Sequence, residues 1–156
     1  MVGWWSGDGP SHDLSGNYNF GNISGVLFGP GKVGPAFEFS GTGYVKVAPS
    51  VPLNVRSLTL AAWINPATES YMPVFQFQED GEYMGALLWA GQPPGGLKGT
   101  LYSNLRESHL NNAVIDAPGV IPTNQWTFVA VTYDQASGVQ RLYVNGEIVK
   151  EANIGS

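Results

Sequence analysis

Cysteine is absent from the 156-residue chain, and charged residues make up only 12% of it. The lack of cysteine excludes a disulfide framework and any metal site with thiolate ligands. Seven Lys and Arg stand against twelve Asp and Glu, so the formal net charge is −5. A basic surface that could hold nucleic acid or an anionic membrane is therefore not expected, and we predict no nucleic-acid partner.

Long hydrophobic runs are also missing. The longest ones, LTLAAWI and GALLWA, are far too short to span a bilayer, so the sequence predicts no membrane insertion. The first residues, MVGWWSGDG, do not combine a basic region with an apolar core, and we expect no secretion signal in this segment.

Turn-forming and aromatic residues are abundant instead. The chain has 21 Gly and 11 Pro, and 12% of its residues are aromatic. Apolar and polar residues alternate in about ten short runs that are separated by Gly, Pro and Asn, and helical periodicity is almost absent. This pattern is typical of an all-β protein in which two antiparallel sheets form a β-sandwich, and the length fits one domain over residues 1–156.

Several runs predict particular strands. Residues 36–39 and 43–47 alternate on either side of Ser and Gly, which predicts a strand, a turn and a second strand. In residues 57–66, SLTLAAWINP, neither face is polar, so we expect a central strand that is covered on both faces. Asn145-Gly146 between two β-rich runs predicts a hairpin with a type I′ turn.

A second hairpin is predicted around the acidic turn Glu79-Asp80-Gly81-Glu82. Before this turn, MPVFQFQ places Val74 and two glutamines on one face of a strand and two phenylalanines on the other. The most loop-like segments are 6–34, 91–99 and 116–125, and the first is long enough to be a candidate for function.

The stretch DLSGNYNFGN, residues 13–22, could be a cation-binding loop. Calcium needs several carboxylate and carbonyl oxygens around one point, and the predicted ligands are Asp8, Asp13, Asn17 and Asn19. An EF-hand is excluded, because Ser24 stands at the twelfth position from Asp13, where a bidentate Glu is required. The alternative is a connector in which Asp and Asn form Asx turns without any metal.

Aromatic and amide side chains in the middle of the chain suggest sugar binding. Sugar rings stack on Trp or Tyr, and their hydroxyl groups pair with amides, carboxylates and Arg. Seven side chains on alternating positions are the candidate ligand-binding residues: Gln76, Gln78, Tyr83, Trp89, Tyr102, Asn104 and Arg106. The alternative is that the strand tryptophans, Trp89 among them, belong to the core.

Residue patterns typical of polysaccharide-active enzymes match this sequence less well than the pattern of a sugar-binding face. The acidic turn has the wrong spacing for a glycosidase strand, in which catalytic carboxylates occupy alternate positions. Tyr102, Arg106 and His109 are residue types that polysaccharide lyases use for proton abstraction and charge neutralisation. Neither pattern is complete, so we expect a non-catalytic binding module, with a polysaccharide-active enzyme as the alternative.

Five strings in fixed order carry a family resemblance: GWWSGDGPSHDLSGNYNFGN, GPGKVGPAFEFSGTGYVKV, SLTLAAWINP, NQWTFVAVTYD and RLYVNGEIV. Together they resemble the concanavalin A-like lectin/glucanase superfamily, specifically its laminin-G-like, pentraxin-related jelly-roll domains. The resemblance implies two curved antiparallel sheets, with ligands on the concave face or at its rim. It also implies an accessory module of a larger secreted or surface protein, in which calcium often bridges the N-terminal loop and the C-terminal segment.

The sequence departs from this family at its end. The family continues after the YVNG hairpin into a final strand, whereas this chain stops at KEANIGS. Because an unpaired edge strand invites a second chain, we predict a possible homodimer through an open sheet edge. The partner of the domain is expected to be a glycan or an extracellular protein, and the alternative function is a structural or adhesion domain without a small ligand.

Overall fold

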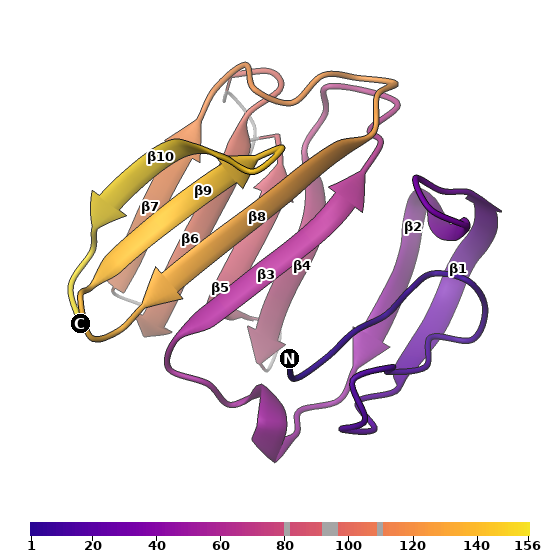
Figure 1. The fold of residues 1–156 in the computed structure, drawn as a ribbon, viewed down its shortest axis with the longest axis horizontal. Coiled ribbons are helices and arrows are strands. Elements are labelled where there is room, and N and C mark those ends of the chain that lie inside the picture. The colour runs from indigo at the N-terminus through magenta and orange to yellow at the C-terminus, as the bar shows by residue number, and fades with distance from the viewer. Residues whose placement is uncertain (80–81, 92–96, 109–110) are drawn as a thin grey trace. The chain divides into compact units, whose positions relative to one another are not determined.

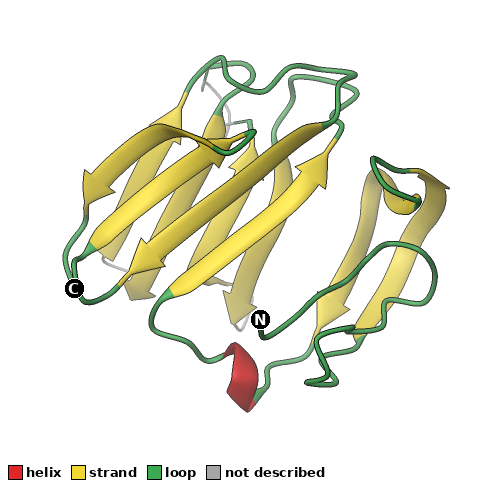
Figure 2. Cartoon of the chain, in the orientation of Figure 1, coloured by secondary structure: helices red, strands yellow, loops and turns green. Residues whose placement is uncertain are grey.

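A computed structural model of the chain describes residues 1–79, 82–91, 97–108 and 111–156. Of residues 78, 79, 82–84, 106–108 and 111 it describes the backbone but not the side chains. The described residues form ten strands and one three-residue 3₁₀ helix, so almost all regular structure is strand (Figure 2). That helix is far too short to span a bilayer, and the described residues form no other.

The strands follow one another along the chain with short connections. They are β1 (Gly21–Pro30), β2 (Pro35–Val47), β3 (Leu58–Ile64), β4 (Met72–Glu79), β5 (Glu82–Ala90), β6 (Leu101–Ser108), β7 (Asn111–Ala117), β8 (Thr127–Asp134), β9 (Val139–Val144) and β10 (Glu147–Asn153), with the 3₁₀ helix η1 (Val51–Leu53) before β3. All described pairings are antiparallel. The predicted all-β class is confirmed.

Two compact units divide the chain, Met1–Val55 and Arg56–Ser156. In the first, β1 and β2 form a two-stranded sheet. In the second, the strand order is β10-β9-β8-β3 in one sheet and β4-β5-β6-β7 in the other, and the two sheets lie in two layers (Figure 1). The predicted sandwich of two antiparallel sheets is confirmed; one domain over residues 1–156 stays a prediction.

The core of the second unit lies between its two sheets. Nine buried side chains form it: Leu88, Ala90, Leu101, Ile115, Ala117, Ile121, Val129, Val131 and Leu142. Strand β5 is unusual, because Ala86 to Ala90 are all less than 5% exposed although alternate residues of a strand point to opposite faces. Strand β5 is therefore buried on both of its faces.

One polar pair crosses the core. Gln140 of β9 and Ser103 of β6 are both fully buried, and Gln140 Nε2 donates a hydrogen bond to Ser103 Oγ over 2.8 Å. The two residues belong to different sheets, so the bond links the layers directly. A buried amide without a partner costs free energy, and the bond therefore fixes how the two sheets face each other.

Both predicted hairpins are present. β4 pairs with β5, and β9 pairs with β10 around Asn145 and Gly146. These two residues have φ values of 52° and 90°. A type I′ turn needs positive φ at both positions, which Asn and Gly adopt at the lowest cost.

Three predictions about local structure are wrong. β2 runs through residues 40–43 as one strand, because the register shift opposite Ser24 and Val26 takes up the extra residues that were expected to form a turn. β1 lies inside the segment 6–34 that was expected to be a loop. β3 is at the end of its sheet, and Trp63 on its outer face is 45% exposed, so this strand is not central.

The alternation expected for MPVFQFQ is also wrong. Register shifts fall between Pro73 and Phe75 and again between Gln76 and Gln78. A bulge changes the face to which the following residues point. As a result Val74 and Phe75 both pack against the core, while Gln76 stands opposite Leu87 on the outer face.

We predict that Ser103→Ala lowers the free energy of unfolding by about 1–3 kcal/mol, because it leaves the buried Gln140 amide without an acceptor. Urea denaturation measures this change. Ser70→Ala removes a hydroxyl from an exposed residue and is the matched control. Equal midpoints for the two variants would show that the bond between the sheets does not contribute.

Candidate functional site

The outer face of the β4-β5-β6-β7 sheet gathers the aromatic and amide side chains. Leu88, Ala90 and Leu101 point into the core, so Leu87, Trp89 and Tyr102 point away from it. Register places the outward residues in two lines across the strands. One line runs Pro73, Trp89, Tyr102, Asp116, and the next runs Gln76, Leu87, Asn104, Val114.

Three aromatic rings contact one another on this face. The Trp89 ring meets the Tyr71 ring edge-on, with centroids 4.8 Å apart and an interplanar angle of 86°. It stacks against Tyr102 at 5.4 Å and 22°. Trp89 is only 4% exposed, whereas Tyr71 is 39% exposed and Tyr102 is half-buried. Trp89 therefore supports the two tyrosines, and these present their rings to the outside.

A glycine brings Tyr71 to this cluster. Gly91 has a φ of 91°, and a Cβ atom built on it would lie 2.8 Å from the Ser70 carbonyl oxygen and 2.9 Å from Tyr71 Cα. Any larger residue at position 91 would push the start of β4 away. The close approach thus sets the position of Tyr71 against Trp89.

Two amides lie beside the aromatic cluster. Asn104 is 5% exposed and donates through Nδ2 to Asn112 Oδ1 at 3.1 Å. Its own Oδ1 and the Oε1 of Gln76 are buried atoms that accept no hydrogen bond from any residue the structure describes. Buried acceptors without a donor are costly, so this pair suits a ligand that brings hydroxyl groups.

The structure brings together four of the seven predicted ligand-binding residues: Gln76, Trp89, Tyr102 and Asn104. The backbones of Gln78, Tyr83 and Arg106 lie in β4, β5 and β6, but their side chains are outside the described residues. Asp80 and His109 also lie outside the described part of the chain. The role of Glu79 in an acidic hairpin is untested for the same reason.

Sequence reasoning missed Tyr71, Asn112 and Asp116. Asp116 stands directly opposite Tyr102, and Asn112 bonds to Asn104. The alternation in AVIDA could have indicated Asp116, since Ile115 next to it is apolar and buried. Tyr71 precedes β4 and has no periodic signal; only the contact with Trp89 identifies it.

Asp13 is the centre of the N-terminal loop. Its Oδ1 accepts from the backbone N–H of Trp4 and of Ser15, each at 2.9 Å. Its Oδ2 accepts from Ser15 Oγ at 2.8 Å and from the Asn19 N–H at 3.0 Å. Burial raises the pKa of this carboxyl, but the hydrogen bonds outweigh it and hold the pKa well below its ordinary value.

The other predicted calcium ligands also make hydrogen bonds, and Asn17 does so by donating through Nδ2 to Ser15 Oγ at 3.0 Å. Asn19 donates through Nδ2 to the Val2 carbonyl at 2.7 Å, and its Oδ1 accepts from Ser50. Asp8 accepts from Ser6, on the exposed side of the loop. A calcium shell needs oxygens with lone pairs aimed at one point, whereas both Asp13 oxygens face N–H and O–H donors. This arrangement does not fit a calcium ion at Asp13, and calcium binding stays a prediction.

Comparison with known proteins places the chain in a family. A family model of the concanavalin A-like lectin/glucanases superfamily, Laminin_G_3, matches residues 39–156. The chain belongs to this superfamily, as the order of its sequence strings indicates. A search of curated proteins by sequence gives no match.

Solved structures share the fold at low sequence identity. Domain 4 of AbnA, a GH43 extracellular arabinanase from Geobacillus stearothermophilus solved with arabinotriose, superposes with a TM-score of 0.58 at 20% identity, over 92% of this chain and 72% of that one. A protein of Bacteroides ovatus ATCC 8483, to which carbohydrate binding is ascribed, gives 0.50 at 23% identity. There the match covers 87% of this chain but 32% of that protein.

We predict that stability supplied by Asp13 is lost as the pH falls below about 4, the ordinary pKa range of Asp. Its folded-state pKa is lowered, so the contribution is present above the unfolded-state pKa and disappears as the folded carboxylate is protonated. Asp13→Asn should lower the free energy of unfolding at pH 7 by about 1–3 kcal/mol and flatten this dependence. Urea denaturation at several pH values measures both effects.

Thermal melts with calcium or EDTA are the control for that loop. If hydrogen bonds alone hold the loop, the melting midpoint is the same with calcium and with EDTA, because no ligand of the native state is added or removed. A midpoint that rises with the logarithm of the calcium concentration would contradict the hydrogen-bonded description and support the predicted calcium loop.

Proposed function

We propose that the chain is a carbohydrate-binding module that takes its ligand on the outer face of the β4-β5-β6-β7 sheet. The observation that carries the proposal is the cluster of Tyr71, Trp89 and Tyr102 beside the acceptor oxygens of Gln76 and Asn104. Sugars need apolar surface for their ring faces and polar groups for their hydroxyls. This face offers both within two neighbouring lines of residues.

The chemistry of the site favours a neutral, hydroxyl-rich ligand. Gln76 Oε1 and Asn104 Oδ1 can only accept, so they pair with hydroxyl donors rather than with a carboxylate. Asp116 stands opposite Tyr102, and its negative charge would repel an anionic sugar. Ring contact with Tyr102 and Tyr71 supplies the apolar part of binding.

The module is proposed to be non-catalytic. Hydrolysis of a glycosidic bond generally uses two carboxyl groups that flank it. Among the described side chains on this face Asp116 is the one carboxylate, placed in the line of Trp89 and Tyr102. The relatives support an accessory role, since AbnA domain 4 is one part of an extracellular enzyme. We infer that this chain likewise serves a secreted or surface protein.

We predict that Tyr102→Ala weakens glycan binding by about tenfold or more, because it removes a half-buried ring of the cluster and its stacking contact with Trp89. A glycan array identifies the ligand, and isothermal titration calorimetry then measures the affinity. Tyr44→Ala removes a ring that is 53% exposed on β2 and should leave the affinity unchanged. If the wild-type protein binds no glycan, or if Tyr102→Ala binds equally well, the proposal is wrong.

A second candidate function is self-association through the edge of β3. Edge strands are usually protected by Pro, by charged residues or by bulges. β4 carries Pro73 and β10 has a register shift, but β3 pairs with β8 over seven residues without a break and contains no charged residue. This edge favours pairing with a second copy of the chain.

We predict a dimer in light scattering coupled to size-exclusion chromatography, with a larger dimer fraction at higher protein concentration. Trp63→Lys places a charge on the edge strand and should shift the protein to monomer. Leu27→Lys puts the same charge on β1, in the first unit, and is the control. A strict monomer at every concentration would rule out this association.

A further inference from the structure

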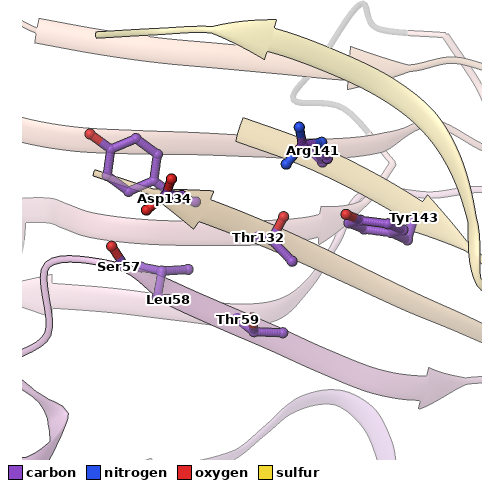
Figure 3. A pocket seen from close by; sticks show the side chains of 8 residues that line it. Ser57, Leu58, Thr59, Thr132, Asp134, Arg141 and Tyr143 are labelled. Atoms are coloured by element: carbon purple, nitrogen blue, oxygen red, sulfur yellow. The ribbon is translucent and has the colours of Figure 1, made fainter. Parts of the chain in front are cut away.

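A hollow lies on the β10-β9-β8-β3 sheet, the other sheet of the second unit. It has a volume of about 460 Å³ and is lined by Ser57, Thr59, Thr132, Asp134, Arg141 and Tyr143 (Figure 3). The core includes or contacts Leu60, Val131 and Leu142. Neighbouring residues of a strand point to opposite faces, so the side chains next to these three, namely Thr59, Thr132 and Arg141, point away from the core. We call this hollow the outer groove. It lies on a different sheet from Trp89 and Tyr102.

The register explains why this face is hollow. Thr59 of β3, Thr132 of β8 and Arg141 of β9 stand opposite one another on three neighbouring strands (Figure 3). The next line across the sheet is Ala61, Ala130 and Tyr143. Short side chains on β3 and β8 therefore form the floor, and the long side chains of β9 form a wall.

Several polar groups that line the outer groove have donors or acceptors that no described residue uses. Arg141 Nε donates to Glu151 on β10, opposite it in the sheet. The terminal nitrogens of Arg141 and the hydroxyls of Thr59, Thr132 and Tyr143 make no hydrogen bond with any residue the structure describes. These groups include both donors and acceptors on one side of the sheet.

The charges around the outer groove do not suit an ionic ligand. The guanidinium of Arg141 is paired with Glu151, and Asp134 adds a second carboxylate that Ser137 Oγ bonds at 2.6 Å. An anionic sugar or a phosphate would meet this carboxylate, and a cation would meet the guanidinium. An apolar ligand would leave the hydroxyls and the guanidinium without partners in a desolvated groove.

We propose that the outer groove is a second binding site, for a neutral oligosaccharide. Its volume is within the range of about 300–1,000 Å³ that small-molecule sites occupy. The ligand's hydroxyls pair with Thr59, Thr132 and the free end of Arg141, and a ring face lies against Tyr143. With sites on two different sheets, one module would hold two segments of polysaccharide and gain avidity on a dense substrate.

The test is a titration of the folded protein followed by the NMR signals of its Thr and Ala methyl groups and its Trp indoles. The probes are neutral trisaccharides, namely arabinotriose, xylotriose, cellotriose and maltotriose, with sialyllactose as the anionic control. We expect at least one neutral probe to shift the methyl signals of Thr59 and Thr132 in a saturable way. Sialyllactose should leave these signals in place.

Two variants separate recognition from folding. Thr132→Val keeps the shape of the side chain but removes its hydroxyl, and Arg141→Met removes the guanidinium; each should weaken this binding by about tenfold. Thr68→Val changes an exposed threonine outside the groove and should have no effect. The methyl spectrum of each variant shows directly whether it is folded.

The outcomes distinguish the two proposed sites. Tyr102→Ala should abolish shifts of the Trp89 indole signal and leave the Thr59 and Thr132 shifts intact. Shifts at Trp89 alone would overturn the outer groove and keep the first site, whereas methyl shifts alone would do the reverse. The outer-groove proposal is overturned if no neutral probe moves the Thr59 and Thr132 methyls, or if Thr132→Val and Arg141→Met bind as wild type.

Discussion

Burial of strand β5 on both faces is the constraint on which the second unit depends. Leu88 and Ala90 join the core on one side, while Leu87 and Trp89 are covered on the other. A slip of β5 by one residue would exchange its two buried sets and move the large Trp89 ring into the close-packed core, so packing defines the register of this strand. Its neighbours β4 and β6 are therefore fixed in register, and with them Gln76 and Tyr102.

Polar groups in buried places then specify the arrangement that apolar packing alone leaves open. Gln140 and Ser103 bond across the core and align one sheet with the other. Asp13 does the same in the first unit, where one carboxylate accepts four hydrogen bonds from three residues. Such contacts contribute only modest net energy, but losing one of them leaves a further buried donor or acceptor unsatisfied. The cost of an unsatisfied buried polar group thus favours this arrangement of the strands over others.

Much of this architecture can be read from periodicity, and the exceptions have a common cause. Asn145-Gly146 predicts its turn because the backbone conformation depends on those two residues alone. Alternation likewise brings Trp89, Tyr102 and Asn104 to one face. It fails at Val74 and Phe75, since a bulge depends on the partner strand as well as on the local sequence. The same limit applies to Asp13, whose hydrogen-bond donors lie up to nine residues away.

The edge position of β3 and the presence of Tyr71 in the candidate site could not be predicted from the sequence, for a similar reason. Residues 58–64 are apolar on both faces, yet the strand they form ends its sheet, because strand order is set by tertiary pairing. Tyr71 joins the candidate site only because Gly91 lets two backbones approach closely. A pattern within one segment carries no information on what the neighbouring segment places beside it.

Both candidate sites rely mostly on uncharged groups, which agrees with a chain that has few charges. The first uses aromatic rings and amide oxygens, and the outer groove uses hydroxyls and the terminal nitrogens of Arg141, whose charge Glu151 balances. Recognition by hydrogen bonds and ring contacts depends on the direction of each group and is hardly screened by salt. Recognition of an anionic polymer would require an excess of Lys and Arg, whereas this chain carries a net charge of −5. Composition, geometry and hydrogen-bonding capacity thus favour the same class of ligand, a neutral polysaccharide.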